Sequence, residues 1–267
     1  MEPRGLMGGL YRISEWIMRL SFINILWIVC ALPFFYFFGS GILSVLNGLV
    51  PEEELLDFIK SWAILLGVLA PFTFFPSTAA MFTVARKWVT GEADVPLFKT
   101  FFKGYKENFK QSLLGGLIYA LIIVILVIDY FVYREQISFV AYIFITFLVL
   151  VVISLFNFFS MIVHYRMTTF QLIKNAMLLT LGKPVRSFTT LIMSGVVLYV
   201  SFFQFQWLLM FFTGSIIAFL AYWNFNIIYI KLQEQVENMK KSEEVEPEIA
   251  AEMDREDLVK TDEPSSK

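Results

Sequence analysis

A row of aromatic side chains and a row of lysines that could bind phosphate groups both repeat at helical spacing within residues 98–110. Phe98 starts an aromatic row that continues at i+4, i+7 and i+11, and Lys99 starts a basic row with the same spacing. Together the two rows comprise Phe98, Lys99, Phe102, Lys103, Tyr105, Lys106, Phe109 and Lys110. Lysines bind the phosphates of nucleic acids or of lipid headgroups. The adjoining aromatic row favours a membrane boundary, where rings sink into the lipid and lysines reach the headgroups.

We therefore predict that residues 98–110 form an in-plane interfacial helix that leads into the next apolar run. Its predicted partners are the lipid bilayer and anionic headgroups, with no nucleic acid. Each lysine near an anionic surface contributes about 1 kcal/mol to binding. Gly104 weakens the helix by about 1 kcal/mol relative to alanine, and membrane contact can offset this cost.

Residues for covalent or metal chemistry are scarce, because the chain has 1 cysteine and 1 histidine. Cys30 lies in an apolar run and cannot form a disulfide within the chain, and a structural zinc site needs about four Cys or His ligands. Asp129 lacks a second membrane carboxylate for an aspartyl protease pair, and the sequence contains no phosphate-binding P-loop. We predict no catalytic residues, no cofactor and no metal site, in a protein that is not an enzyme.

Two prolines interrupt an apolar run that is otherwise long enough to cross a membrane. Pro71 and Pro76 each lack a backbone donor, and the hydroxyls of Thr73, Ser77 and Thr78 can bond to the carbonyls that are freed. One interpretation is a broken helix that holds a solute near the middle of the membrane. The other is an ordinary kinked helix, packed closely by small residues. The sequence leaves both interpretations open.

Four asparagines lie in or beside the apolar runs: Asn24, Asn157, Asn224 and Asn226. Buried amides can hold helices together through hydrogen bonds of about 0.6–2 kcal/mol, or they can line a path for a ligand. We therefore mark a helix kink or possible polar path at Pro71, Thr73, Pro76 and Asn157.

Composition places these residues in a membrane protein, since 58% of the chain is hydrophobic and only 16% is charged. A soluble domain carries about 25% charged residues. Four apolar runs each approach the roughly 20 residues that cross a bilayer as a helix. The uncharged stretch from Phe188 to Ile230 is too long for one span and predicts a hairpin with its turn near Gln204 and Gln206. The predicted spans are residues 20–38, 62–84, 113–132, 140–163, 188–205 and 207–230.

The predicted fold is thus all-α: a polytopic transmembrane helix bundle over residues 1–230, with cytoplasmic amphipathic interfacial helices. With six spans and a cytoplasmic N-terminus, the predicted inner segments hold nineteen of the 21 Lys and Arg residues. Lys60 and Arg134 are the two that remain outside. This asymmetry predicts that both termini are cytoplasmic.

A second amphipathic segment and an acidic tail are also predicted to lie on the cytoplasmic side. The stretch from Tyr165 to Ser187 carries an apolar stripe and a capping residue at Thr168 or Thr169, and the stripe comprises Phe170, Ile173, Met177 and Leu181. Residues 231–267 hold twice as many acidic as basic residues. We expect a helix that extends from the last span and then a largely disordered acidic end.

Four motifs resemble a known family when they are taken in order along the chain. They are INILW from Ile23, PFTFFPSTAAMF from Pro71, YKENFKQ from Tyr105 and IKNAMLL from Ile173. The set is similar to the YesL-like family of bacterial integral membrane proteins, over about residues 8–230. The resemblance implies a multi-pass protein of the bacterial cell membrane with no established activity, so it transfers no catalytic residues.

Genes of YesL-like proteins often lie beside genes for carbohydrate ABC transporters and sugar sensors. The resemblance therefore implies a non-enzymatic accessory component linked to carbohydrate uptake or sensing, with ABC-transporter or sensor subunits as partners. The alternative is a small-solute transporter or channel. Transporters driven by protons or sodium usually carry acidic residues deep in the membrane, and Asp129 at the edge of its run is a marginal candidate.

Overall fold

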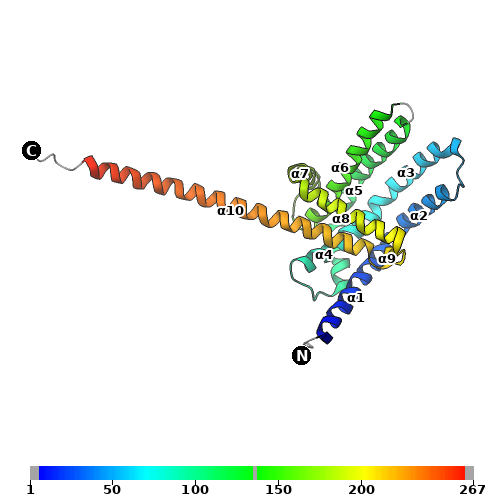
Figure 1. Ribbon diagram of the computed structural model, residues 1–267, viewed down its shortest axis with the longest axis horizontal. Coiled ribbons are helices and arrows are strands. Elements are labelled where there is room, and N and C mark those ends of the chain that lie inside the picture. Colours follow the sequence, from blue (N-terminus) through cyan, green and yellow to red (C-terminus); the bar gives the residue numbers. More distant parts are fainter. Residues whose placement is uncertain (1–5, 135–136, 262–267) are drawn as a thin grey trace, which may run out of the picture. The chain divides into compact units, whose positions relative to one another are not determined.

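The computed structural model describes residues 6–134 and 137–261, and every regular element within these ranges is a helix. The predicted all-α class is therefore confirmed. The chain divides into two compact units, Met1–Phe225 and Asn226–Lys267, and each is described by itself. Figure 1 labels the helices along the chain.

Six helical segments in the described residues are long and apolar enough to cross a membrane, as predicted. They are Gly8–Cys30, Glu52–Phe72, Leu97–Tyr133, Phe139–Ile162, Pro184–Gln204 and Thr213–Lys241. The bounds of the first two differ from the predicted spans at residues 20–38 and 62–84. In both cases a proline explains the difference.

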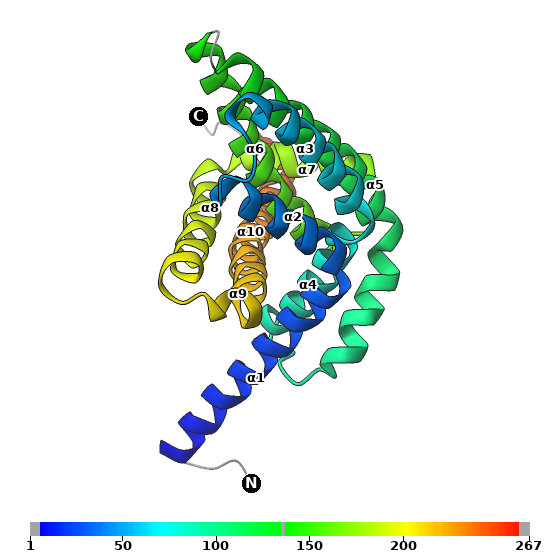
Figure 2. The same ribbon diagram turned by 90° about the vertical axis from the view of Figure 1, so that its right-hand side faces the viewer.

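The first apolar run is split between two helices, α1 (Leu6–Cys30) and α2 (Leu32–Leu46). Figure 2 shows the bend between them. Pro33 lies in the first turn of α2, where its missing N–H costs nothing, whereas inside a continuous helix it would remove a hydrogen bond. The run predicted as one span at residues 20–38 therefore consists of two helices, because the chain changes direction at Ala31. Where this run crosses the membrane stays a prediction.

The second run is also divided, into α3 (Leu55–Phe72) and α4 (Phe74–Val89), after a short 3-10 turn η1 (Glu52–Glu54). Thr73 separates the two helices with φ −120° and ψ −57°, outside helical geometry. The predicted single span at residues 62–84 thus becomes two helices that meet between Pro71 and Pro76.

Helix α5 (Leu97–Tyr133) contains the predicted interfacial helix and the predicted third span without a break. Its 37 residues extend about 55 Å, well beyond a hydrocarbon core of about 30 Å. Residues 98–110 therefore form the first turns of a helix that continues into the next apolar run. That they lie in the plane of the interface stays a prediction. The first turns of α5 pack against α4, where Gly104 lies against Thr83, and Phe101 is also buried.

Helix α5 is also the central element of the first unit, packing against α3, α4 and α6 (Ser138–Ile162). Glycines bring the neighbouring helices close. A Cβ at Gly115 would lie 2.2 Å from the Phe158 ring, and one at Gly116 would lie 3.0 Å from the backbone of Pro71. Figure 1 shows α5 and α6 side by side.

Helix α7 (Thr169–Gly182) begins at a capping box, in which Thr168 and Gln171 bond to each other's backbone N–H groups. This confirms Thr168 as the cap. The buried face of α7 consists of Leu172, Ala176 and Thr180, whereas Phe170 and Leu181 of the predicted stripe are 73% and 63% exposed.

The uncharged stretch forms a hairpin as expected. Helix α8 (Pro184–Tyr199) runs into a π-helical turn η2 (Val200–Gln204), and a short helix α9 (Trp207–Phe211) follows. The chain leaves helical geometry at Phe205, beside the predicted turn residues.

Helix α10 (Thr213–Thr261) supplies its first turns to the first unit and continues through the second. The acidic tail is therefore helical to Thr261, where a largely disordered end was predicted. Residues 232–241 are rich in Gln, Glu, Met and Lys, which favour helices, and Glu237 pairs with Lys241 one turn later at 2.8 Å. The last part of that prediction, residues 262–267, lies outside the described residues.

Candidate functional site

Asn24 on α1 joins α1 to the irregular backbone before α10. Its side-chain amide is fully buried and donates to the carbonyls of Leu209 at 3.2 Å and Met210 at 2.7 Å. Its oxygen accepts the backbone N–H of Ser215 at 3.1 Å. Gly214 lets α1 approach, since a Cβ there would lie 2.5 Å from the Trp27 ring. Asn24 therefore satisfies backbone groups that the break between α9 and α10 leaves open.

Asn157 on α6 holds three helices together. It donates to the Thr180 hydroxyl on α7 at 2.9 Å and to the Ser187 hydroxyl on α8 at 3.4 Å. One turn earlier, Ser154 bonds to Tyr119 of α5 at 2.8 Å. These membrane-depth polar groups bond to one another across helices, the first of the two roles expected for the asparagines.

The proline kink is tightly packed. Pro71 and Pro76 are both fully buried, and the backbone of Pro71 lies against Gly116 of α5. The Thr73 hydroxyl bonds to the Leu69 carbonyl at 2.9 Å, and Ser77 bonds to the Thr73 carbonyl at 2.8 Å.

These hydroxyl contacts correct one detail of the prediction. In a regular helix, Pro71 and Pro76 would leave the carbonyls of Gly67 and Phe72 without their donors. The hydroxyls instead bond to neighbouring carbonyls. Thr78 bonds to the Phe74 carbonyl at 2.7 Å and also accepts the indole N–H of Trp27 at 2.9 Å. The kink is thus tied to α1, while Asn157 of the predicted path bonds to α7 and α8.

A group of charged and aromatic side chains closes the end of the bundle that bears the 90–96 and 163–168 connections. Arg19 is buried and pairs with Glu15 and Asp94, which links α1 to the connection after α4. Arg86 donates to the Val163 carbonyl at the end of α6.

His164 follows Val163 directly, and its Nδ1 lies 2.8 Å from the Tyr222 hydroxyl of α10. Burial, with a smaller contribution from the Arg86 charge, lowers the pKa of His164 below its usual value. His164 is therefore biased toward the neutral form in the folded protein.

The eight predicted interfacial residues lie on the outer side of α5. All four lysines are exposed, and Phe98 and Phe102 are exposed to 59% and 39%. Tyr105 and Phe109 are half-buried. Asn108 faces α4 instead and donates to the Thr83 hydroxyl at 3.3 Å. This arrangement is compatible with lipid contact, which stays a prediction.

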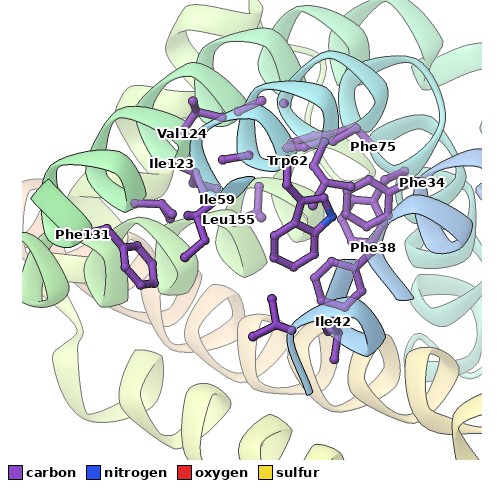
Figure 3. Close-up of a pocket in the computed structure, with 18 of the residues that line it drawn as sticks. Phe34, Phe38, Ile42, Ile59, Trp62, Phe75, Ile123, Val124, Phe131 and Leu155 are labelled. Atoms are coloured by element: carbon purple, nitrogen blue, oxygen red, sulfur yellow. The ribbon is translucent and has the colours of Figure 1, made fainter. Parts of the chain in front are cut away.

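An apolar cavity of about 480 Å³ lies between α2, α3, α4 and α5 (Figure 3). Sequence reasoning missed it. Its wall includes Phe38 of α2, Trp62 of α3 and Phe131 of α5. Ala63, Gly67 and Ala70 share one face of α3 and line the cavity, but this row of small residues does not by itself indicate a cavity, because Val124 of α5 fills the space beside Gly67. The lining residues are apolar, so this cavity offers nothing to bind a polar solute.

Large apolar side chains cover the outside of the first unit. Tyr36, Phe139 and Ile192 are 67%, 76% and 63% exposed, on three of its helices. Many large apolar side chains of the described residues are exposed in this way, whereas large exposed apolar patches are rare on soluble monomers. Together with the six long apolar helices, these surfaces define a multi-pass helical membrane protein.

Residues 20–130 match the model of a family described as "Protein of unknown function, DUF624". The chain is 35% identical over 129 residues to the uncharacterized protein YteU of Bacillus subtilis (strain 168), covering 48% of this chain and 43% of YteU. It is 32% identical over 111 residues to the uncharacterized protein YesL of that strain, covering 42% of this chain and 37% of YesL. These matches confirm the resemblance to YesL-like proteins.

A third relative, the uncharacterized protein YesV of Bacillus subtilis (strain 168), is 32% identical over 132 residues, with 48% of this chain and 64% of YesV covered. The chain thus spans between about a third and two thirds of the length of these relatives. No solved structure matches the chain. None of the matched names indicates an enzyme family.

Proposed function

We propose that this protein is a non-enzymatic accessory component of the bacterial cell membrane, acting by association with other membrane subunits. The proposed partners are ABC-transporter or sensor subunits of a carbohydrate uptake system. The carbohydrate link rests on the resemblance to YesL-like proteins and their gene neighbourhoods. Both termini are proposed to be cytoplasmic, on the basis of the distribution of lysine and arginine.

The observation that supports an accessory role is how the bundle uses its membrane-depth polar groups. Asn24, Tyr119 and Asn157 each bond to another helix or to irregular backbone. A solute path needs polar groups that can exchange their partners with the solute. Here those groups stabilise the positions of the helices. This arrangement suits a protein that acts by binding partners through its surface.

Two features weigh against the small-solute transporter. The kink at Pro71 and Pro76 is buried and closed by the contact with Gly116. The cavity beside it is lined by apolar residues, and a sugar hydroxyl placed there without a partner costs about 2–7 kcal/mol.

Crosslinking and purification from native membranes, combined with sugar flux into liposomes that contain only this protein, would test the proposal. We expect transporter or sensor subunits to be recovered and no flux above protein-free liposomes. Saturable sugar flux through the purified protein that is lost in Asn157→Ala would contradict it. Ser44→Ala, which removes an exposed hydroxyl on α2, is the matched control for loss of a polar group.

A further inference from the structure

The apolar cavity is elongated. In Figure 3, Phe34 and Phe75 stand at one end and Phe131 stands at the other. The first end lies beside the kink between α3 and α4. The second end lies at the last turn of α5. Its volume of about 480 Å³ falls within the range of ligand sites in proteins, which is about 300–1,000 Å³.

Trp62 forms a fixed wall of this cavity. Its indole N–H donates to the Phe37 carbonyl of α2 at 2.9 Å, and its ring stacks on Phe38 with centroids 5.9 Å apart. Gly41 provides the room for the ring, because a Cβ at that position would lie 2.2 Å from the indole. The indole therefore has its hydrogen bond within the protein and presents only its carbon surface to the cavity.

The chemistry of the wall limits the ligand to hydrocarbon. Every residue that lines the cavity is apolar, and Trp62, which has a polar atom, uses it elsewhere. A hydroxyl, amide or charge inside would lose its hydrogen bonds to water without replacement. An alkyl chain has no hydrogen bonds to lose, and each methylene group that it buries adds favourable free energy of binding. In a membrane protein, the abundant molecule with such a chain is a phospholipid.

Charge at the Phe131 end indicates which kind of phospholipid. The guanidinium of Arg134 lies over the Phe131 ring, 5.6 Å from its centroid. Lys60, next to the lining residue Ile59, is paired with Asp57 at 3.0 Å, so its charge is balanced and the preference for an anionic lipid depends on Arg134. A cation beside an apolar cavity complements a phosphodiester joined to an acyl chain, and it favours a lipid of net negative charge over one whose headgroup carries its own ammonium.

We propose that this cavity binds one acyl chain of an anionic phospholipid, with the phosphate of that lipid at Arg134. The site does not depend on the accessory role proposed above. It would hold its lipid whether or not the protein associates with transporter subunits.

Native mass spectrometry of the full chain, purified in mild detergent and supplied with equal parts phosphatidylglycerol and phosphatidylcholine, tests the acyl-chain site. We expect the wild-type protein to retain a single phospholipid. Ala63→Phe fills the cavity and should reduce retention by at least about tenfold, the effect of excluding about two methylene groups. Ile64→Phe, on the exposed side of the same helix, should retain the lipid as wild type does.

Equal retention by Ala63→Phe and wild type would overturn the site. A wild-type protein that retains no phospholipid would also overturn it. So would a dimer of the chain that forms in the wild type and is lost in Ala63→Phe. Thermal unfolding of both variants separates loss of the ligand from loss of the fold. Should Ala63→Phe unfold, Ala120→Leu fills the cavity from α5 and replaces it in the comparison.

Arg134→Gln tests the charge. It should retain phospholipid but lose the preference for phosphatidylglycerol over phosphatidylcholine, by about threefold to tenfold, the effect of one charge-assisted contact. An unchanged preference would overturn the assignment of the phosphate to Arg134. Lys183→Gln removes a lysine from the start of α8, away from the cavity, and is the control.

Discussion

The Asn24 side chain accepts the backbone N–H of Ser215 at 3.1 Å, across 191 residues of sequence. The same side chain donates to two carbonyls at the end of α9. One buried amide on α1 thus satisfies both sides of the break that precedes α10. Without it, three backbone groups would be left in a region where water cannot reach them.

Asn24→Leu should therefore destabilise the protein by about 1–3 kcal/mol, because leucine has a similar size but cannot bond to these groups. The measurement is the free energy of unfolding in detergent, from a denaturant titration. Asn47→Leu changes an exposed asparagine after α2 and should shift stability by less than about 0.5 kcal/mol. Equal effects of the two substitutions would remove the structural role of Asn24.

Gly116→Ala should destabilise the protein by about 1–3 kcal/mol, because its Cβ would lie 3.0 Å from the Pro71 backbone, which cannot move aside as a side-chain tip can. Gly195→Ala on α8 is the control, since nothing lies within 4 Å of its Cβ position. That control should be neutral or gain up to about 1 kcal/mol in helix stability. Thermal unfolding of the two variants checks the difference. A stable Gly116→Ala would mean that α5 and the kink are not in close contact.

The lowered pKa of His164 predicts that the folded protein loses stability on acidification. Its pKa is lowered in the folded protein by burial, with a smaller contribution from Arg86, relative to about 6.5 in the unfolded chain. As the pH falls below about 6.5, the unfolded state takes up a proton before the folded state does, so stability decreases until the folded pKa is passed. Above about 6.5, His164 is neutral in both states and contributes no pH dependence.

His164→Gln should show a smaller fall in unfolding midpoint between about pH 7.5 and pH 5.5 than the wild-type protein shows. Glutamine can still bond to the Tyr222 hydroxyl, which bonds to His164 in the wild type. An identical pH profile for the two proteins would assign the acid sensitivity to other groups.

Orientation can be measured with single cysteines introduced after Cys30→Ser. Glu53→Cys, Lys106→Cys and Glu244→Cys place a thiol in a predicted outer loop, on the predicted inner part of α5 and in the tail. Only Glu53→Cys should react with an impermeant thiol reagent added to whole cells, because the other two sites should lie inside. Labelling of Lys106→Cys under the same conditions would reverse the proposed orientation.

A peptide with the sequence of residues 98–110 should become helical on anionic vesicles and less so on neutral ones. Its four lysines are exposed in the structure and can reach headgroups. Added salt should weaken the effect on anionic vesicles by screening. Circular dichroism measures the helicity. Equal helicity on both kinds of vesicle, unaffected by salt, would leave the aromatic row as the only contact with lipid.

The amino-acid sequence by itself determined the class of this protein and its number of long apolar helices. Apolar runs of span length are a local property, and so are a capping residue such as Thr168 and a turn between two uncharged stretches. Each depends on residues within a few turns of one another. For the same reason the sequence could identify Pro71, Pro76 and the asparagines as unusual without saying what they contact.

The tertiary structure decided where the helices break and what the polar residues bond to. Pro33 is favourable in the first turn of α2, but the direction that α2 takes from α1 depends on packing, and Gly104 near the start of α5 packs against Thr83 of α4. Asn24 meets Ser215, and Asn157 meets Thr180, only after distant helices pack together. The apolar cavity likewise depends on side chains from several helices. No local pattern encodes a space of that kind, because its shape is set by packing between segments far apart in the chain.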